Sequence, residues 1–109
     1  MHTNKARLIL IYITAPTKSE AKRLLKMLIE KRIVACGNIS KIESIYRWKG
    51  KIINSAEWAI IAKTLEANFE KTKREIEKVH PYEIPCIIKI PSTSNEKFFS
   101  WLRGELKHW

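Results

Sequence analysis

The sequence contains no aspartate and no glutamine, and it has only three glycines and two cysteines among 109 residues. Without aspartate there is no Ser-His-Asp set, and the three histidines (His2, His80 and His108) lie far apart along the chain. Three glycines are too few for a glycine-rich phosphate-binding loop. No nucleophile, base and orienting group can be recognised together, so we predict that the chain is not an enzyme.

Long hydrophobic runs and paired cysteines are also missing. The apolar run from Leu8 to Ile13 is shorter than the core of a signal peptide and far below the roughly 20 residues of a membrane span. Cys36 and Cys86 stand alone, with no C-x-x-C pair. This pattern favours a reduced, cytoplasmic protein over a disulfide scaffold, and no membrane segment is expected.

Positive charge is abundant. Lys and Arg number 21 against 11 acidic residues, all of them glutamate, which gives a formal net charge of +10. A basic nucleic-acid-binding module would produce this excess, and so would a lysine-rich solvated surface. The basic residues are spread along every segment, and the K/R-G-F/Y-G/A-F-V-x-F/Y strand of RNA recognition modules is absent. We therefore keep nucleic-acid binding as the alternative function and expect no specific nucleic acid.

Residues 43–64 form the most distinctive stretch and predict one long β-hairpin. Positions alternate in a period of two from Ile42 to Trp48, Gly50 supplies a turn residue, and the return arm ends in an apolar run that is typical of a central strand. An arm of about twelve residues spans about 40 Å, whereas a compact chain of this size is roughly 34 Å across. The hairpin should therefore overhang its own core and pair with another subunit.

The first half of the chain predicts a strand, a helix and a second strand. Residues 7–14 have the continuous apolar pattern of a buried strand. Thr17 and Glu20 form a capping box for a helix that should end near residues 31–32. Its core side is formed by residues Ala21, Leu24, Leu25 and Leu28. Residues 33–36 should begin the second strand, with a bulge or bend at Gly37.

The second half predicts a helix, a strand and a final helix. Leu65, Phe69, Thr72, Ile76 and Val79 share one helical stripe, which should stop at His80 because Pro81 follows. Residues 82–85 should be extended and residues 86–90 a strand. Thr93 and Glu96 predict a capping box for a helix with the apolar stripe Phe98, Trp101, Leu102 and Leu106.

This order predicts a single domain over residues 1–109 of the α+β class. Two βαβ units joined by a hairpin give a ferredoxin-like sandwich (βαββαβ) with a four-stranded antiparallel sheet and two helices on one face. The long β2–β3 hairpin and the extra C-terminal helix are additions to that plan. The fold hosts many unrelated functions and does not by itself assign one.

Several short motifs together resemble one known family. They are Ala35-Cys36-Gly37-Asn38, Ser44-x-Tyr46-x-Trp48-x-Gly50, Glu57, Lys63-Thr64, His80-Pro81-Tyr82-Glu83-x-Pro85 and Trp101. In combination they resemble the CutA divalent cation tolerance proteins. The resemblance implies a ferredoxin-like fold, a cytoplasmic homotrimer and a role in tolerance of divalent metal ions, copper among them. It places Tyr46, Trp48, Gly50 and Trp58 in the hairpins that build the trimer.

The resemblance also indicates candidate metal ligands. His80 offers an imidazole at a helix end, suited to copper or zinc, and Cys36 offers a weaker, thiolate ligand. Each residue also has a purely structural interpretation. His80 could simply be a histidine favoured at a helix C-terminus, and Cys36 a small residue buried in a strand. Ile13 and Val79 occupy positions where members assigned a copper site have a cysteine and a histidine. No cofactor is expected to be obligatory, and Cu²⁺ or another divalent cation is the candidate ligand.

A carboxylate among apolar strand residues points to a second kind of site. Glu57 shares its predicted face with Ala59 and Ile61 and therefore needs a polar partner. We predict that a cleft between subunits is lined by Glu57, Lys63, His80, Tyr82 and Trp48. The alternative is a structural hydrogen-bond network that fixes the assembly.

Overall fold

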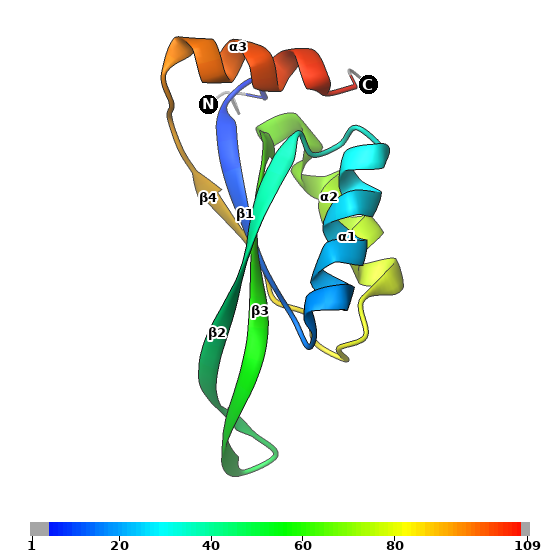
Figure 1. Cartoon of the computed structure of the whole chain (residues 1–109), viewed down its shortest axis with the longest axis vertical. Helices are drawn as coiled ribbons and strands as arrows, with labels where there is room; N and C mark the ends of the chain where they lie inside the picture. Colours follow the sequence, from blue (N-terminus) through cyan, green and yellow to red (C-terminus); the bar gives the residue numbers. More distant parts are fainter. Residues whose placement is uncertain (1–4, 108–109) are drawn as a thin grey trace.

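The computed structural model describes residues 5–107 and contains one four-stranded sheet and three α-helices within that range (Figure 1). In chain order the elements are β1 (Leu8–Ala15), α1 (Lys18–Glu30), β2 (Cys36–Trp48), β3 (Lys51–Leu65), the short 3-10 helix η1 (Glu66–Asn68), α2 (Phe69–Val79), β4 (Ile87–Pro91) and α3 (Glu96–Glu105). The predicted order of strands and helices is confirmed.

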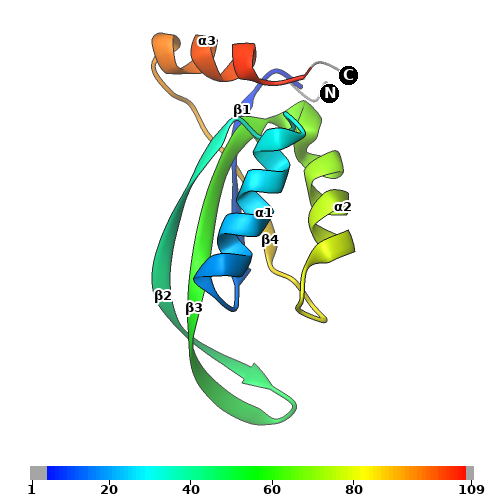
Figure 2. The same cartoon turned by 45° about the vertical axis from the view of Figure 1, so that its right-hand side comes forward.

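The sheet has the strand order β2-β3-β1-β4, and every neighbouring pair is antiparallel. Helices α1 and α2 cover one face, and α3 lies across the end of the sheet away from them (Figure 2). This is the predicted ferredoxin-like α+β sandwich with an additional C-terminal helix. Strands β2 and β4 form the two edges of the sheet.

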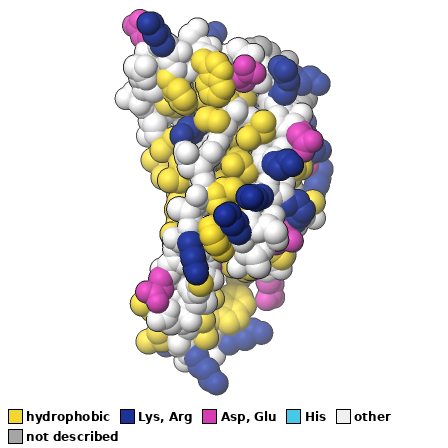
Figure 3. Space-filling view, viewed as in Figure 1, with side chains coloured by type: hydrophobic (Ala, Val, Ile, Leu, Met, Phe, Trp, Pro, Cys, Tyr) yellow, Lys and Arg dark blue, Asp and Glu magenta, His cyan; other side chains and the backbone are white. Residues whose placement is uncertain are grey.

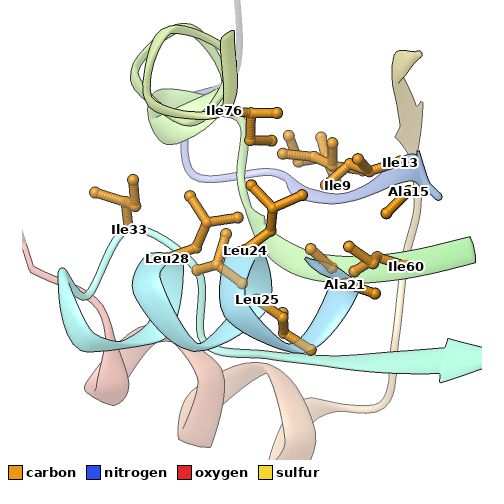
Figure 4. Packing of buried hydrophobic residues seen from close by; sticks show 13 residues of the cluster. Ile9, Ile13, Ala15, Ala21, Leu24, Leu25, Leu28, Ile33, Ile60 and Ile76 are labelled. Carbon is orange, nitrogen blue, oxygen red and sulfur yellow. The ribbon is translucent and has the colours of Figure 1, made fainter. Parts of the chain in front are cut away.

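The core fills the layer between the sheet and the two covering helices. Leu24 and Leu28 of α1, Ile76 of α2, and Ile9 and Ile13 of β1 are fully buried and point toward one another (Figure 4). Burying such side chains stabilises the fold by about 1.5–3 kcal/mol each. The predicted apolar stripe of α1 is thereby confirmed.

Local sequence signals set the ends of α1 and of the hairpin. The Thr17 side chain accepts a hydrogen bond from the Glu20 amide at 3.1 Å, as the capping box predicts. At the hairpin turn, Lys49 and Gly50 have φ angles of 49° and 80°. Such a pair of positive φ values belongs to the tight turn that matches the twist of the two strands.

The hairpin is the longest feature of the molecule. Strands β2 and β3 are 13 and 15 residues long, and they continue well beyond the helices (Figures 1 and 2). The longest dimension of the protein is 44 Å, against 33 and 26 Å for the other two. The predicted overhang is confirmed.

Two predictions at the start of β2 are wrong. Residues Ile33, Val34 and Ala35 are buried but lie in a loop, because the chain must first turn back from α1 through Arg32 at a φ of 58°. Gly37 pairs with Ala62 in an unbroken register, so no bulge is present. A Cβ atom at Gly37 would lie 2.7 Å from Leu25 Cδ1, and glycine is needed for close packing of α1 on the sheet.

Three predictions in the second half also need correction. Helix α3 begins at Glu96 after Asn95, which makes no side-chain cap, so the capping box with Thr93 does not form. Val79 is exposed at the end of α2, because the chain leaves the helix there toward Pro81. Residues 82–84 form bends and not an extended segment.

The face of α3 that packs against the sheet is also shifted from the prediction. Leu102 and Leu106 are buried there, with Phe98 and Phe99 partly buried beside them. Trp101 remains 45% exposed and contacts the Phe98 ring at a centroid distance of 5.7 Å. Among residues 5–107 no helix is both long enough and apolar enough to span a membrane.

Candidate functional site

One face of the sheet carries the polar and aromatic residues that the sequence singled out. We call it the open face, because α1 and α2 cover the opposite one and α3 covers only its end. The strand register assigns to this face Leu8, Leu10, Tyr12 and Thr14 of β1, alternate residues from Cys36 to Trp48 of β2, alternate residues from Lys51 to Leu65 of β3, and Ile88 and Ile90 of β4.

A groove of about 680 Å³ lies between the overhanging half of the hairpin and the loop that leads into β4. It is lined by Tyr12, Thr14, Ser44, Ile45, Tyr46, Trp48, Glu57, Pro81, Tyr82, Glu83, Ile84 and Cys86. Its volume lies within the range of small-molecule sites. The walls are largely aromatic and aliphatic, and a buried carboxylate lies among them.

Glu57 is that carboxylate. It is only 8% exposed, and its Oε2 accepts a hydrogen bond from the Tyr82 hydroxyl at 2.5 Å. Burial, together with this bond to a negative group, raises the pKa of Tyr82 well above its usual value. The phenol therefore stays protonated and acts as a donor. Between residues 5 and 107, no lysine, arginine or histidine forms an ion pair with Glu57.

His80 joins the same network from the end of α2. Its Nε2 lies 2.7 Å from the carbonyl oxygen of Thr14, and its Nδ1 accepts a hydrogen bond from the Tyr82 amide at 3.0 Å. These partners require a neutral imidazole with its proton on Nε2. The Nε2 contact holds the loop after α2 against β1, and the Nδ1 contact fixes the turn at Tyr82, so a metal ion could reach His80 only by displacing one of these partners.

Lys63 and Cys36 lie elsewhere on the open face. They are opposite each other in the β2–β3 register, and the Lys63 ammonium donates to Asn38 Oδ1 at 2.6 Å. Along β3, Lys63 is six residues from Glu57, or about 20 Å. Within one chain the structure brings Glu57, Tyr82 and His80 together and leaves Lys63 and Cys36 apart from them.

Neither thiol is set up as a reactive anion. Burial raises the pKa of the Cys36 thiol, although Lys63 acts in the opposite direction. Burial and the nearby Glu57 carboxylate raise the pKa of the Cys86 thiol. Both cysteines are free. The described residues, 5–107, contain no cluster of three or more His, Cys, Asp or Glu side chains that could hold a metal ion.

The predicted hairpin residues divide between the two faces. Tyr46 and Trp48 line the groove and are 43% and 37% exposed. Gly50 forms the turn. Trp58 packs against the core on the helix-covered face, with the Lys18 ammonium 5.5 Å from its ring centroid.

Several groove residues were not anticipated from the sequence. Tyr12 is the one aromatic residue in the apolar run of β1, and that exception to the run was the available signal. Thr14 and Cys86 gave no signal, and Ser44 was distinguished only as part of the family motif. Sequence reasoning also missed the buried Thr64, whose hydroxyl donates to the Ile33 carbonyl and accepts from Asn68.

The fold and the groove together define a ferredoxin-like α+β protein with an overlong central hairpin and a ligand-sized groove on its open sheet face. The family model described as CutA1 divalent ion tolerance protein matches residues 9–105. The chain belongs to the CutA family.

Individual relatives agree with this assignment. The divalent-cation tolerance protein CutA of Archaeoglobus fulgidus is 43% identical over 93 residues, which cover 84% of this chain and 91% of the relative. The protein of the same name from Thermotoga maritima is 41% identical over 98 residues, or 88% of this chain and 96% of the relative. A solved structure, described as the periplasmic divalent cation tolerance protein CutA from Archaeoglobus fulgidus, superimposes with a TM-score of 0.90 at 39% identity, covering 92% of this chain and 99% of that one.

Proposed function

We propose that this chain is a non-enzymatic divalent-cation tolerance protein that works as a cytoplasmic homotrimer. In this proposal the groove around Glu57 is the working site and lies at the cleft between subunits. Family membership supports the tolerance role. The open face of the sheet supports the assembly and is the observation on which the proposal depends most.

The open face is too apolar for a surface that remains in water. Ile61 of β3 and Ile88 and Ile90 of β4 are 37%, 51% and 42% exposed, and their strands lie on either side of β1. Monomeric proteins rarely expose large contiguous apolar patches of this kind. The edge strands β2 and β4 also carry unpaired backbone N–H and C=O groups. An exposed edge as long as the 13 residues of β2 can pair with a strand of another subunit.

Assembly through the open face would place the groove at a boundary between subunits. Tyr46 and Trp48 line the groove and also belong to the overhanging hairpin. A neighbouring subunit that packs beside the hairpin would form the outer wall of the groove. Lys63, which is distant from Glu57 in its own chain, would then be available to the neighbour's cleft.

Copper or another divalent cation remains the candidate ligand for His80 and Cys36. An ion at His80 would have to replace the Tyr82 amide or the Thr14 carbonyl as the partner of the imidazole. Cys36 is too far along the sheet to join His80 in one chain, so further ligands would have to come from a second subunit. A weak and assembly-dependent site is what this geometry supports.

Nucleic-acid binding is the second candidate, favoured by the net charge of +10. The visible Lys and Arg side chains are spread from the α3 end to the hairpin tip and do not gather in one region (Figure 3). Among the strand residues on the open face, only Lys51 and Lys63 are basic. A sheet surface for RNA would need more positive charge than this, so the tolerance role is preferred.

Growth under metal stress tests the proposed function. A host strain that lacks this gene should grow more poorly than the wild type in excess Cu²⁺, and a plasmid copy should restore growth. Glu57→Gln should restore less growth than Lys97→Ala, an exposed substitution on α3 away from the groove. Equal growth of the deleted and restored strains across Cu²⁺, Zn²⁺ and Cd²⁺ would contradict the proposal.

A further inference from the structure

The groove around Glu57 differs in charge from the rest of the molecule. The chain has 21 lysines and arginines, yet none lines the groove, whose charged residues are Glu57 and Glu83. Glu57 is buried, whereas Glu83 is exposed at the rim. The lining of the groove is therefore negatively charged although the protein has a net charge of +10, and this negative charge favours the binding of cations.

The walls of the groove are aromatic as well. Tyr12, Tyr46, Trp48 and Tyr82 line it around the Glu57 carboxylate. Aromatic faces attract organic cations by about 0.5–2 kcal/mol each, and a set of such rings is a common way to bind alkylammonium groups. The ring of Trp48 already has a cation near its face, because the Lys49 ammonium lies 5.8 Å from its centroid.

The carboxylate is available to such a ligand. Of the two carboxylate oxygens of Glu57, only Oε2 has a hydrogen-bond partner among residues 5–107, and that partner is the Tyr82 hydroxyl. No fully buried side-chain oxygen atom among residues 5–107 lacks a hydrogen-bond partner, so the second oxygen of Glu57, which has no partner there, is not fully buried. Tyr82 stays a neutral donor and adds no negative charge of its own. Lys49 and Lys51, beside Trp48 at the hairpin tip, lie outside the lining.

We propose that the groove binds a small organic ammonium ion, with Glu57 as the counter-ion and Tyr46, Trp48 and Tyr82 as the aromatic walls. This inference deepens the proposed function and depends on it, because the cleft between subunits is the same site. A bare metal ion fits the groove less well, since no cluster of three ligands is present among residues 5–107. A volume of about 680 Å³ is also far larger than a metal ion needs.

Calorimetric titration with choline and with its neutral carbon isostere, 3,3-dimethylbutan-1-ol, tests the inference. The two probes have nearly the same shape and differ in charge. Choline should bind at least about tenfold more tightly than the alcohol, because only the cation gains the ring and carboxylate interactions. Equal affinities would mean that the groove is merely apolar and would overturn the inference.

Two isosteric substitutions localise the effect. Glu57→Gln keeps an acceptor for Tyr82 but removes the charge, and it should weaken choline binding about tenfold. Glu43→Gln removes the same charge from the same hairpin on the opposite face, outside the lining, and should leave binding unchanged. Equal losses in both variants would show only a long-range charge effect and would contradict a site at Glu57.

The mass of the assembly is measured on the same samples. A trimer that does not bind choline would mean that a side chain of the neighbouring subunit fills the groove, which overturns this inference and leaves the proposed trimer intact. A monomer that binds choline would overturn the proposed assembly and retain the ammonium site.

Discussion

At the scale of single residues, Tyr82 connects the two parts of the candidate site. Its amide donates to His80, and its hydroxyl donates to Glu57. One residue therefore fixes both the loop after α2 and the buried carboxylate of β3. Pro81 restricts the backbone just before it, which holds this arrangement with little loss of entropy.

Tyr82 should ionise later than an ordinary tyrosine. Burial raises its pKa, and the Glu57 carboxylate raises it further. A raised pKa in the folded state favours the neutral phenol, so its contribution to stability is complete below about pH 10 and is lost as the pH rises above that value. Absorbance at 295 nm should show a late-titrating phenol, and Tyr82→Phe should remove it.

Tyr46→Phe is the matched control for this titration, because it removes a groove tyrosine that does not bond to Glu57. The late step should remain in that variant. A late step that survives in Tyr82→Phe would contradict the proposed hydrogen bond between Tyr82 and Glu57.

Copper binding, if it occurs at His80, should be weak. The imidazole must give up the Thr14 or the Tyr82 hydrogen bond before it can coordinate a metal ion. We expect a dissociation constant no better than micromolar. Titration of Cu²⁺ should show the loss of this binding in His80→Ala.

The other two histidines need to be removed before this comparison. His2 and His108 lie outside the described residues, and their imidazoles are further candidate copper ligands. With both replaced by alanine in every sample, unchanged binding in the His80→Ala variant would rule out His80 as a ligand.

At the scale of elements, α1 packs so closely on β2 that one position must be glycine. A Cβ atom at Gly37 would lie 2.7 Å from Leu25 Cδ1 and 3.0 Å from the carbonyl oxygen of Ile61. Gly37→Ala should destabilise the protein by about 1–3 kcal/mol, as overpacking does. Denaturant unfolding at equilibrium measures the change.

Gly104 provides the opposite case. It lies in α3 with open space around the Cβ position, so Gly104→Ala should stabilise the protein by about 0.5–1 kcal/mol. Two substitutions of the same type should therefore have opposite signs. Equal effects would contradict the packing described for Gly37.

The two covering helices are joined by one ion-pair cluster. Glu75 of α2 accepts from Lys31, which caps α1, at 2.9 Å, and pairs with Lys78 at 3.0 Å. The hydrogen bonds from Lys31 and then Lys78 lower the pKa of Glu75 from 4.5 to about 2. Its contribution to stability is present above the unfolded value and is lost as the pH falls from about 4.5 to 2.

Glu75→Gln should therefore flatten the acid side of the stability profile. Melting temperatures from pH 5 to pH 2.5 should fall less in this variant than in the wild type. Glu77→Gln, on the exposed side of the same helix, is the control. The effect should be small because both lysines are largely exposed. Parallel acid profiles in wild type and Glu75→Gln would contradict the assignment.

At the scale of the whole molecule, periodicity predicted the architecture well. The apolar run of β1, the capping box of α1, the alternation from Ile42 to Trp48 and the Pro81 stop after α2 predicted the order of elements along the chain and the overhanging hairpin. Gly37 shows the limit of such reasoning, because its role is set by Leu25 on a helix that is distant in sequence. The missing cap of α3 shows another, since a motif does not reveal where the chain will leave the sheet.

The candidate site was predicted only in part, for a related physical reason. Glu57 was identifiable as a carboxylate that needs a partner, and Tyr82 is that partner. The sequence could not show that both ring nitrogens of His80 form hydrogen bonds with backbone groups, because one of those groups, the Thr14 carbonyl, is 66 residues away. The separation of Lys63 from Glu57 did follow from spacing, because six residues of a strand span about 20 Å.

Assembly through the open face is the central claim of this account, and native mass spectrometry at micromolar concentration tests it most directly. A homotrimer should have three times the chain mass of 12.8 kDa. Trp48→Glu should loosen the assembly, because an unpaired charge buried at the hairpin costs several kcal/mol. A wild-type protein that remains a stable monomer under these conditions would contradict the account.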